Sequence, residues 1–125
     1  MRRAFLAGLL ALPIAVPLAA CATDANSDPR AFTGVWQWSF ETSAFTTTRG
    51  EGPYWLVAEG ADWEALVAPL RDSGGPWGRV AVVIEGNLSP VGQYGHLGAY
   101  SRQLRVTRVI EARLLSTLPG PPQGS

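Results

Sequence analysis

The chain has 125 residues, of which 46% are hydrophobic and 16% are charged, and this predicts one small folded domain rather than two domains or a disordered polymer. Ten arginines balance ten acidic residues, so the basic excess of a general nucleic-acid-binding protein is missing and no nucleic-acid partner is expected. One cysteine and one histidine exclude an internal disulfide and a metal cage built from His and Cys alone, and no cofactor is predicted.

Residues 1–20 have the pattern of a secretory signal peptide. Arg2 and Arg3 supply the positive start, and the residues that follow are uncharged and mostly apolar. An apolar run of this length is also long enough for a membrane-spanning helix. Pro13 and Pro17 argue against that alternative, because each proline interrupts the hydrogen bonding of a helix.

The segment Leu18-Ala19-Ala20-Cys21 resembles a bacterial lipobox, which lipoprotein signal peptidase cuts before the cysteine. The resemblance implies lipidation of Cys21, with diacylglycerol on the sulfur and an acyl chain on the new amino terminus. At ~0.8 kcal/mol per buried methylene, these chains would make the membrane anchor almost irreversible. Ala22 stands where an aspartate is associated with inner-membrane retention, which implies an outer-membrane location facing the periplasm. The alternative is an ordinary signal peptide with an incidental cysteine.

Two further segments are expected to lie outside the folded domain. Residues 21–31 are polar and aperiodic, and they predict a lipidated cysteine followed by a flexible tether. Residues 119–125 are rich in proline and glycine and predict a disordered tail. The folded domain is therefore expected at 32–118. From Cys21 onward, eight arginines stand against ten acidic residues, which gives a net charge of −2.

The N-terminal half of the domain predicts two strands and a loop. Residues 32–42 alternate, with the aromatic side chains of Phe32, Trp36, Trp38 and Phe40 on one parity, and this predicts a strand with one buried face. The polar residues 46–53 predict a loop. Residues 54–59 predict a second strand that is apolar on both parities.

A short helix is predicted next. Asp62 is a candidate N-cap, Pro69 predicts a helix that is short or kinked near its end, and residues 73–76 should terminate it. The apolar residues recur at helical spacing, at Trp63, Leu66, Val67 and Leu70.

Two long strands complete the domain. Residues 79–88 read as an interior strand, because Val80, Val82 and Ile84 alternate with two further apolar residues. Residues 104–115 predict the last strand, in which Arg108 breaks the alternation and indicates a bulge or an edge.

The order β-β-α-β-β predicts a mainly β fold. If the first strand bends and pairs on both sides, these elements close into a small OB-like Greek-key barrel whose one short helix plugs an end. The alternative is an open antiparallel sheet with one packed helix. The pattern predicts four strands, whereas an OB-fold has five.

The segment 89–103 stands out as a loop of about fifteen residues between two strong strands, a length typical of functional or disordered loops. Its large side chains, which include Tyr94, His96, Leu97 and Tyr100, favour partial burial. Glycines recur every third residue and permit tight reversals. We therefore expect an ordered loop packed on the barrel.

Several segments resemble those of small, mostly uncharacterised Gram-negative lipoproteins. They are Gly-Val-Trp at 34–36, Glu-Thr-Ser-Ala-Phe at 41–45, Tyr-Trp-Leu at 54–56, and the longer segments 85–90, 94–102 and 106–111. Some of these proteins are similar to the OB-like domain of NlpE-type envelope lipoproteins, which are linked to copper tolerance and surface sensing. The chain lacks the Cys-x-x-Cys motif of the NlpE N-terminal domain, so the resemblance implies fold and location rather than copper chemistry.

Five residues are candidates for contact with a ligand or partner: Glu41, Tyr94, His96, Tyr100 and Arg102. His96 either donates a hydrogen bond to a loop carbonyl and holds the turn, or takes a functional role with a carboxylate from Glu41 or Glu85. Glu41 either forms a structural ion pair with an arginine such as Arg102 or Arg108, or reads a ligand. No catalytic motif and no metal site is recognised. Most of the five tryptophans are expected in the core.

These observations predict a non-enzymatic, lipid-anchored envelope protein. The loop at 89–103 would present a binding or structural surface to a protein or glycan of the envelope. A small-ligand or metal-ion sensor that uses His96 and nearby carboxylates is the alternative. A hydrolase is a third class, and it would need a pocket that joins His96 to a serine or a carboxylate.

Overall fold

The computed structural model describes residues 28–119, so the predicted signal peptide, Cys21, most of the tether and nearly all of the tail lie outside the described residues. The elements are β1 (Arg30–Ser39), β2 (Thr42–Thr47), β3 (Tyr54–Val57), α1 (Gly60–Ser73), β4 (Trp77–Leu88), the 3-10 turn η2 (His96–Gly98) and β5 (Gln103–Leu118). Within this part of the chain, no helix has the length and apolar character needed to cross a membrane.

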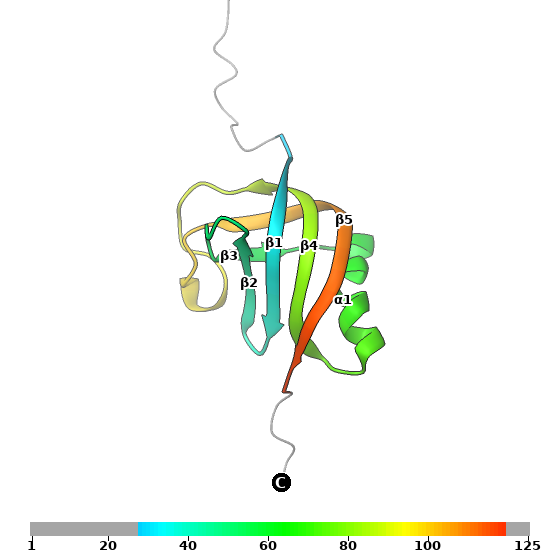
Figure 1. Ribbon diagram of the computed structural model, residues 1–125. Coiled ribbons are helices and arrows are strands. Elements are labelled where there is room, and N and C mark those ends of the chain that lie inside the picture. Colours follow the sequence, from blue (N-terminus) through cyan, green and yellow to red (C-terminus); the bar gives the residue numbers. More distant parts are fainter. Residues whose placement is uncertain (1–27, 120–125) are drawn as a thin grey trace, which may run out of the picture.

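The strands close into a barrel in the order β1-β2-β3-β5-β4, with β4 pairing back to β1 (Figure 1). Neighbouring strands are antiparallel except β3 and β5, which pair in parallel over three residues. The fold is mainly β, and its strand order and single helix are compatible with an OB-like barrel. The predicted closed barrel is confirmed, and the open-sheet alternative is wrong.

β1 pairs with both β2 and β4, as predicted, and its register places Gly34 opposite Thr47 on one side and Val82 on the other. The strand begins at Arg30, so two residues of the predicted tether belong to the barrel. The predicted alternation fails at Phe40. This residue lies in a two-residue turn between β1 and β2 and its side chain is 68% exposed.

β2 is the fifth strand, which the sequence pattern did not predict. Residues 46 and 47 were expected in the following loop, but they pair with β1. β2 turns Ser43 and Phe45 toward the barrel interior and its remaining residues are half-buried. Because those residues are mostly threonines, the strand carries little hydrophobic alternation and reads as a polar turn.

α1 covers the end of the barrel near the β1–β2 turn. Leu66 and Leu70 are buried, and the Trp63 ring packs edge-on against Trp36 and Trp38, with centroids 5.7 and 5.0 Å apart. The helix continues through Pro69 to Ser73 rather than ending near the proline, and it ends at Gly74 in the left-handed region, in the segment expected to terminate it.

One expectation at the helix fails, whereas the one for the tryptophans holds for three of the five. The N-cap is Glu59, with no side-chain hydrogen bond, so the predicted capping by Asp62 is wrong. Of the five tryptophans, Trp36 is fully buried and the partly buried Trp38 and Trp63 pack against the core, whereas Trp55 and Trp77 lie outside it.

β5 is bent by three bulges. It has sixteen residues against twelve in β4, and its pairing with β4 skips Thr107, Ile110 and Leu115. The first bulge lies next to Arg108, where the broken alternation indicated one. Bulges bend a strand and increase its twist, which lets β5 pair first with β3 and along its length with β4.

A buried serine links three strands. The Trp36 indole N–H donates to Ser43 Oγ at 2.9 Å, and the Ser43 hydroxyl donates to the Leu56 carbonyl at 2.7 Å. Ser43→Ala would leave both partners buried without a hydrogen bond, so we expect it to lower the free energy of unfolding by about 2 kcal/mol. Urea denaturation measures this loss. Exposed Ser116→Ala is the control and should change stability by less than about 0.5 kcal/mol, and equal effects of the two would contradict this role of Ser43.

Candidate functional site

The loop between β4 and β5 (residues 89–102), here called the β4–β5 loop, is an ordered extension of the barrel. At its base, the Ser89 N–H donates to the Gln103 carbonyl at 2.8 Å. Further out, Tyr94 and Tyr100 exchange two backbone hydrogen bonds of 2.8 and 3.1 Å. The η2 turn forms the tip between these two tyrosines. The loop is therefore held by its own backbone, as its composition predicted.

Trp55 of β3 is the surface on which this loop rests. The Tyr100 ring packs against the Trp55 ring, with centroids 5.1 Å apart and the planes at 61°. Gly95 crosses the indole so closely that a Cβ there would lie 2.5 Å from two ring carbons, and its φ of +75° is in the left-handed region. Only glycine satisfies both demands, so the loop backbone covers one part of the Trp55 side chain.

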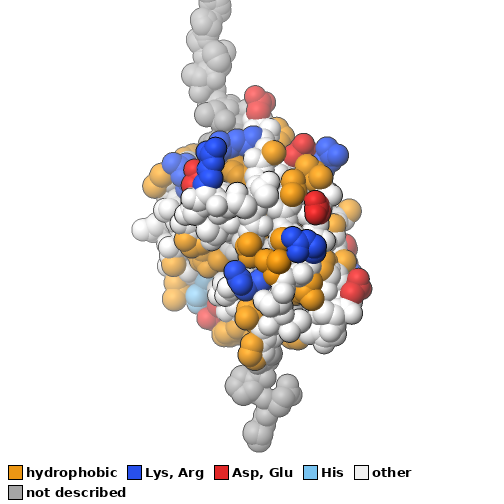
Figure 2. Space-filling model, in the orientation of Figure 1, with side chains coloured by type: hydrophobic (Ala, Val, Ile, Leu, Met, Phe, Trp, Pro, Cys, Tyr) orange, Lys and Arg blue, Asp and Glu red, His pale blue; other side chains and the backbone are white. Residues whose placement is uncertain are grey.

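Glu41 and His96 join the β1–β2 turn to the tip of the loop. The Glu41 Oε1 and His96 Nε2 atoms lie 3.1 Å apart, and the side chains are 46% and 38% exposed. Figure 2 shows the chain's one histidine beside an acidic side chain on the surface. An exposed pair of this kind contributes little stability, ~1 kcal/mol or less. Its significance is that it places two surface segments that are far apart in the sequence next to each other.

The other predicted partners of these residues are wrong. The Arg102 guanidinium donates to the Ser89 carbonyl at 2.8 Å, and the Arg108 guanidinium lies 3.6 Å from the Glu85 carboxylate. Among residues 28–119, neither arginine pairs with Glu41, and the His96 ring contacts the Glu41 carboxylate rather than a loop carbonyl. Barrel closure decides this, because it brings the β1–β2 turn to the loop tip and leaves Arg108 beside β4.

Backbone strain gathers at the same place. Among residues 28–119, Glu41 and Leu97 are the two non-glycine residues with positive φ, at 57° and 56°. The left-handed region disfavours a side chain by ~1 kcal/mol or more. Leu97 is also 90% exposed. An apolar side chain that is both strained and solvated gains nothing for the barrel, and such positions cluster at ligand-contacting and switch regions.

We define the tip surface as Phe40, Glu41, His96 and Leu97. The sequence pointed to Glu41 and His96, whereas it placed Phe40 in the core and did not include Leu97 among the candidate site residues. Tyr94, Tyr100 and Arg102 shape the loop instead: the Tyr94 hydroxyl donates to the Pro90 carbonyl at 3.0 Å, in addition to the contacts given above. Trp55 was missed because β3 is apolar on both parities.

The tip surface does not form an enclosed reaction site. The Glu41–His96 distance suits proton transfer, but the cavities described below are lined by other residues. Within the described residues, no group of three or more His, Cys, Asp and Glu side chains could hold a metal ion. Glu41 and His96 would supply two ligands, fewer than the three protein ligands of a typical catalytic zinc site.

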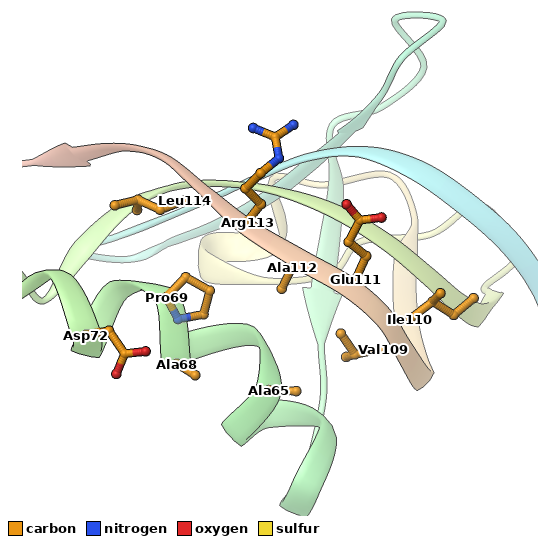
Figure 3. Close-up of a pocket in the computed structure, with 10 residues that line it drawn as sticks. All are labelled: Ala65, Ala68, Pro69, Asp72, Val109, Ile110, Glu111, Ala112, Arg113 and Leu114. Carbon is orange, nitrogen blue, oxygen red and sulfur yellow. The ribbon is translucent and has the colours of Figure 1, made fainter.

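A groove of about 680 Å³ lies between α1 and β5 (Figure 3). Small residues of α1, Ala65 and Ala68, face Ala112 across it, whereas Glu111 and Arg113 point to the other side of the strand. Beyond Arg105, β5 pairs with β4 alone, so its other edge is open toward this groove. The bulges make that edge irregular, and an irregular edge does not readily pair with an added strand. We therefore attribute the groove to the barrel's construction.

Comparison with protein-family models, with curated proteins and with solved structures finds no match to this chain. The resemblance to small Gram-negative lipoproteins therefore stays a prediction that rests on the motifs quoted above. Two of those segments, 41–45 and 94–102, meet in the folded chain through the contact between Glu41 and His96.

Proposed function

We propose that this protein is a lipid-anchored envelope protein without enzymatic activity, and that its barrel presents the tip surface to a protein partner. The observation that carries the proposal is Leu97, which is 90% exposed and held in a left-handed backbone beside the Glu41–His96 pair. Phe40, which precedes Glu41 in the β1–β2 turn, is 68% exposed, and its ring lies 6.3 Å from that of Trp77. Exposed apolar side chains next to a polar Glu–His pair are suited to insertion into a partner's pocket with a polar rim.

The position of the tip surface relative to the N-terminal end of the barrel supports this role. The described chain enters at the start of β1, and the β1–β2 turn lies at the other end of that strand (Figure 1). If Cys21 is lipidated, the bilayer is on the side of the barrel where Arg30 lies. The tip surface would then face away from the bilayer, toward the periplasm in the outer-membrane location that the lipobox implies.

A protein partner is favoured over a glycan. Proteins recognise sugars largely by stacking them on open aromatic faces. On the outer surface of β3, Trp55 is the aromatic side chain that could offer such a face. The loop backbone at Gly95 and the Tyr100 ring already occupy part of its surface. The exposed groups that remain at the tip are aliphatic, aromatic and charged, which is the composition of a protein-binding patch.

The test compares two exposed leucines in cells. Leu97→Asp and the control Leu115→Asp both add a charge at an exposed position, and Leu115 lies in a bulge of β5 opposite Arg79 and Val80 rather than in the β1–β2 turn or the β4–β5 loop. After in-cell crosslinking and purification, we expect the partner to be reduced about tenfold with Leu97→Asp and retained with Leu115→Asp. Recovery of the same partners with both variants would refute the proposal. Urea denaturation checks that both variants fold.

A metal-ion or small-ligand sensor is the second candidate, because Glu41 and His96 place one carboxylate and one imidazole together at 3.1 Å. Calorimetric titration with Zn²⁺ and Cu²⁺ separates it from the first. The binding proposal predicts no heat that depends on His96. Micromolar binding that is lost in His96→Ala would favour the sensor instead.

A further inference from the structure

The end of the barrel opposite α1 forms a hollow of about 360 Å³. Phe32, which is only 7% exposed, belongs to the core beneath it. The hollow is otherwise polar, and its lining includes Arg30, Thr48, Arg49 and Tyr54. We call it the barrel mouth. Mouths of small barrels are common ligand sites, because strand ends bring side chains together around a concave surface.

A side-chain contact holds Arg30 of the mouth, whereas the order at Arg49 is in its backbone. Arg30 lies two residues before Phe32 on β1, and its guanidinium carbon is 4.8 Å from the centre of the Phe32 ring, a cation–π contact. The loop of Arg49 is organised by Thr47, whose Oγ1 accepts hydrogen bonds from the Arg49 and Glu51 backbone N–H groups at 3.2 and 3.0 Å. The Phe32 contact lowers the entropy lost when the Arg30 guanidinium binds a ligand, and the ordered loop limits where Arg49 can reach.

The guanidiniums of the mouth are available for an anion. Within the described residues, neither Arg30 nor Arg49 has a carboxylate within 4.0 Å. By contrast, Arg105 and Arg108 are each paired with a glutamate, at 3.5 and 3.6 Å. Glu51 is the acidic residue in the lining, and its carboxylate accepts a hydrogen bond from the Thr47 hydroxyl at 3.3 Å. The negative charge of Glu51 repels an anion, so the affinity of the mouth for an anion depends on this residue.

We propose that the barrel mouth binds the phosphate of a bilayer lipid headgroup. The inference builds on the proposed lipid anchor: nine residue steps separate Cys21 from Arg30 and span ~30 Å at most, so headgroups are always within reach. Basic side chains gather on the barrel at the end where β1 starts (Figure 2), and the lining of the mouth holds two arginines. Each guanidinium can donate two parallel hydrogen bonds to a phosphate, and the Thr48 and Tyr54 hydroxyls in the lining add further donors.

The chain from Ala22 onward is the sample for the test, because the strand pairing and the core that the structure describes lie within 30–118. Its net charge of −2 gives no general attraction to an anionic surface. We expect it to sediment with vesicles that contain phosphatidylglycerol and not with vesicles of phosphatidylcholine alone. The double variant Arg30→Gln/Arg49→Gln should bind about 30-fold more weakly, the factor that two surface arginines supply. Glu51→Gln should bind more tightly.

Arg79→Gln is the matched control, because Arg79 is an exposed arginine near the opposite end of the barrel, paired with Gln37 of β1. Its vesicle binding should change less than about twofold. An equal loss in Arg79→Gln and the double variant, or no preference for the anionic vesicles, overturns the proposal. Saturable NMR shifts with inorganic phosphate in the absence of vesicle binding would also overturn it, by assigning the mouth to a free anion. None of these results depends on lipidation of Cys21. A failure of the proposed lipid anchor can therefore be distinguished from a failure of the proposed headgroup site.

Discussion

Gly34→Ala is expected to lower the free energy of unfolding by about 3 kcal/mol or more, or to prevent folding. Gly34 lies in the middle of β1, between β2 and β4. A Cβ at this position would overlap the Thr46 carbonyl oxygen and lie 2.9 Å from the Phe45 ring carbon Cζ. The barrel cannot yield there without separating β1 from β2 or displacing the buried Phe45.

Urea denaturation with Gly75→Ala as the control measures this effect. Gly75 follows α1, has no positive φ, and the nearest atom to its added Cβ would be 3.5 Å away, an ordinary van der Waals contact. We therefore expect Gly75→Ala to change stability by less than about 0.5 kcal/mol. Equal stabilities of the two variants would mean that β1 and β2 do not approach each other as described.

Gly95→Ala is expected to lift the β4–β5 loop from the barrel while the barrel stays folded. The added Cβ would collide with the Trp55 indole at 2.5 Å, and the φ of +75° would strain any L-residue. The loop backbone and Tyr100 can move away without disturbing the core, because this contact lies on the outer side of β3. We expect a large shift of the Trp55 indole N–H resonance in NMR and an about tenfold loss of partner recovery.

Gly98→Ala separates backbone strain from the collision with Trp55. Gly98 also has a positive φ, of 67°, but the nearest atom to its Cβ would be the Gln93 Cβ at 3.3 Å. This variant should therefore carry similar strain and leave the Trp55 resonance near its original position. A Trp55 resonance that is unmoved in Gly95→Ala, or moved equally in Gly98→Ala, would show that the loop does not rest on Trp55.

The barrel could be predicted largely because hydrophobic periodicity survives in its longest elements. Val80, Val82 and Ile84 alternate along β4 and are all buried, and Leu66 and Leu70 define the buried stripe of α1. β2 gives no such signal, because a threonine-rich strand that is half-buried on its outer side looks like a polar loop. The strand order of the barrel depends on β2, because β2 joins β1 to β3, so the order could not be predicted without it.

The tip surface could be predicted only in part, because it depends on closure of the barrel. Glu41 and His96 are 55 positions apart, and no local pattern indicates that they meet. The turn itself is hidden as well, since Glu41 takes the left-handed conformation that glycine or asparagine usually signals. Without that signal, Phe40 continues the aromatic parity of β1 and is assigned to the core, although it is 68% exposed.

Metabolic labelling tests the central claim, which is that Cys21 fastens this barrel to the cell envelope. Cells that express the native chain or Cys21→Ser are fed radioactive palmitate, and the purified proteins are compared on one gel. We expect label in the native chain, no label in the serine variant, and a precursor that stays larger because cleavage fails. Unlabelled native protein, or a serine variant that is processed and fractionates like the native chain, would contradict the anchored-protein account.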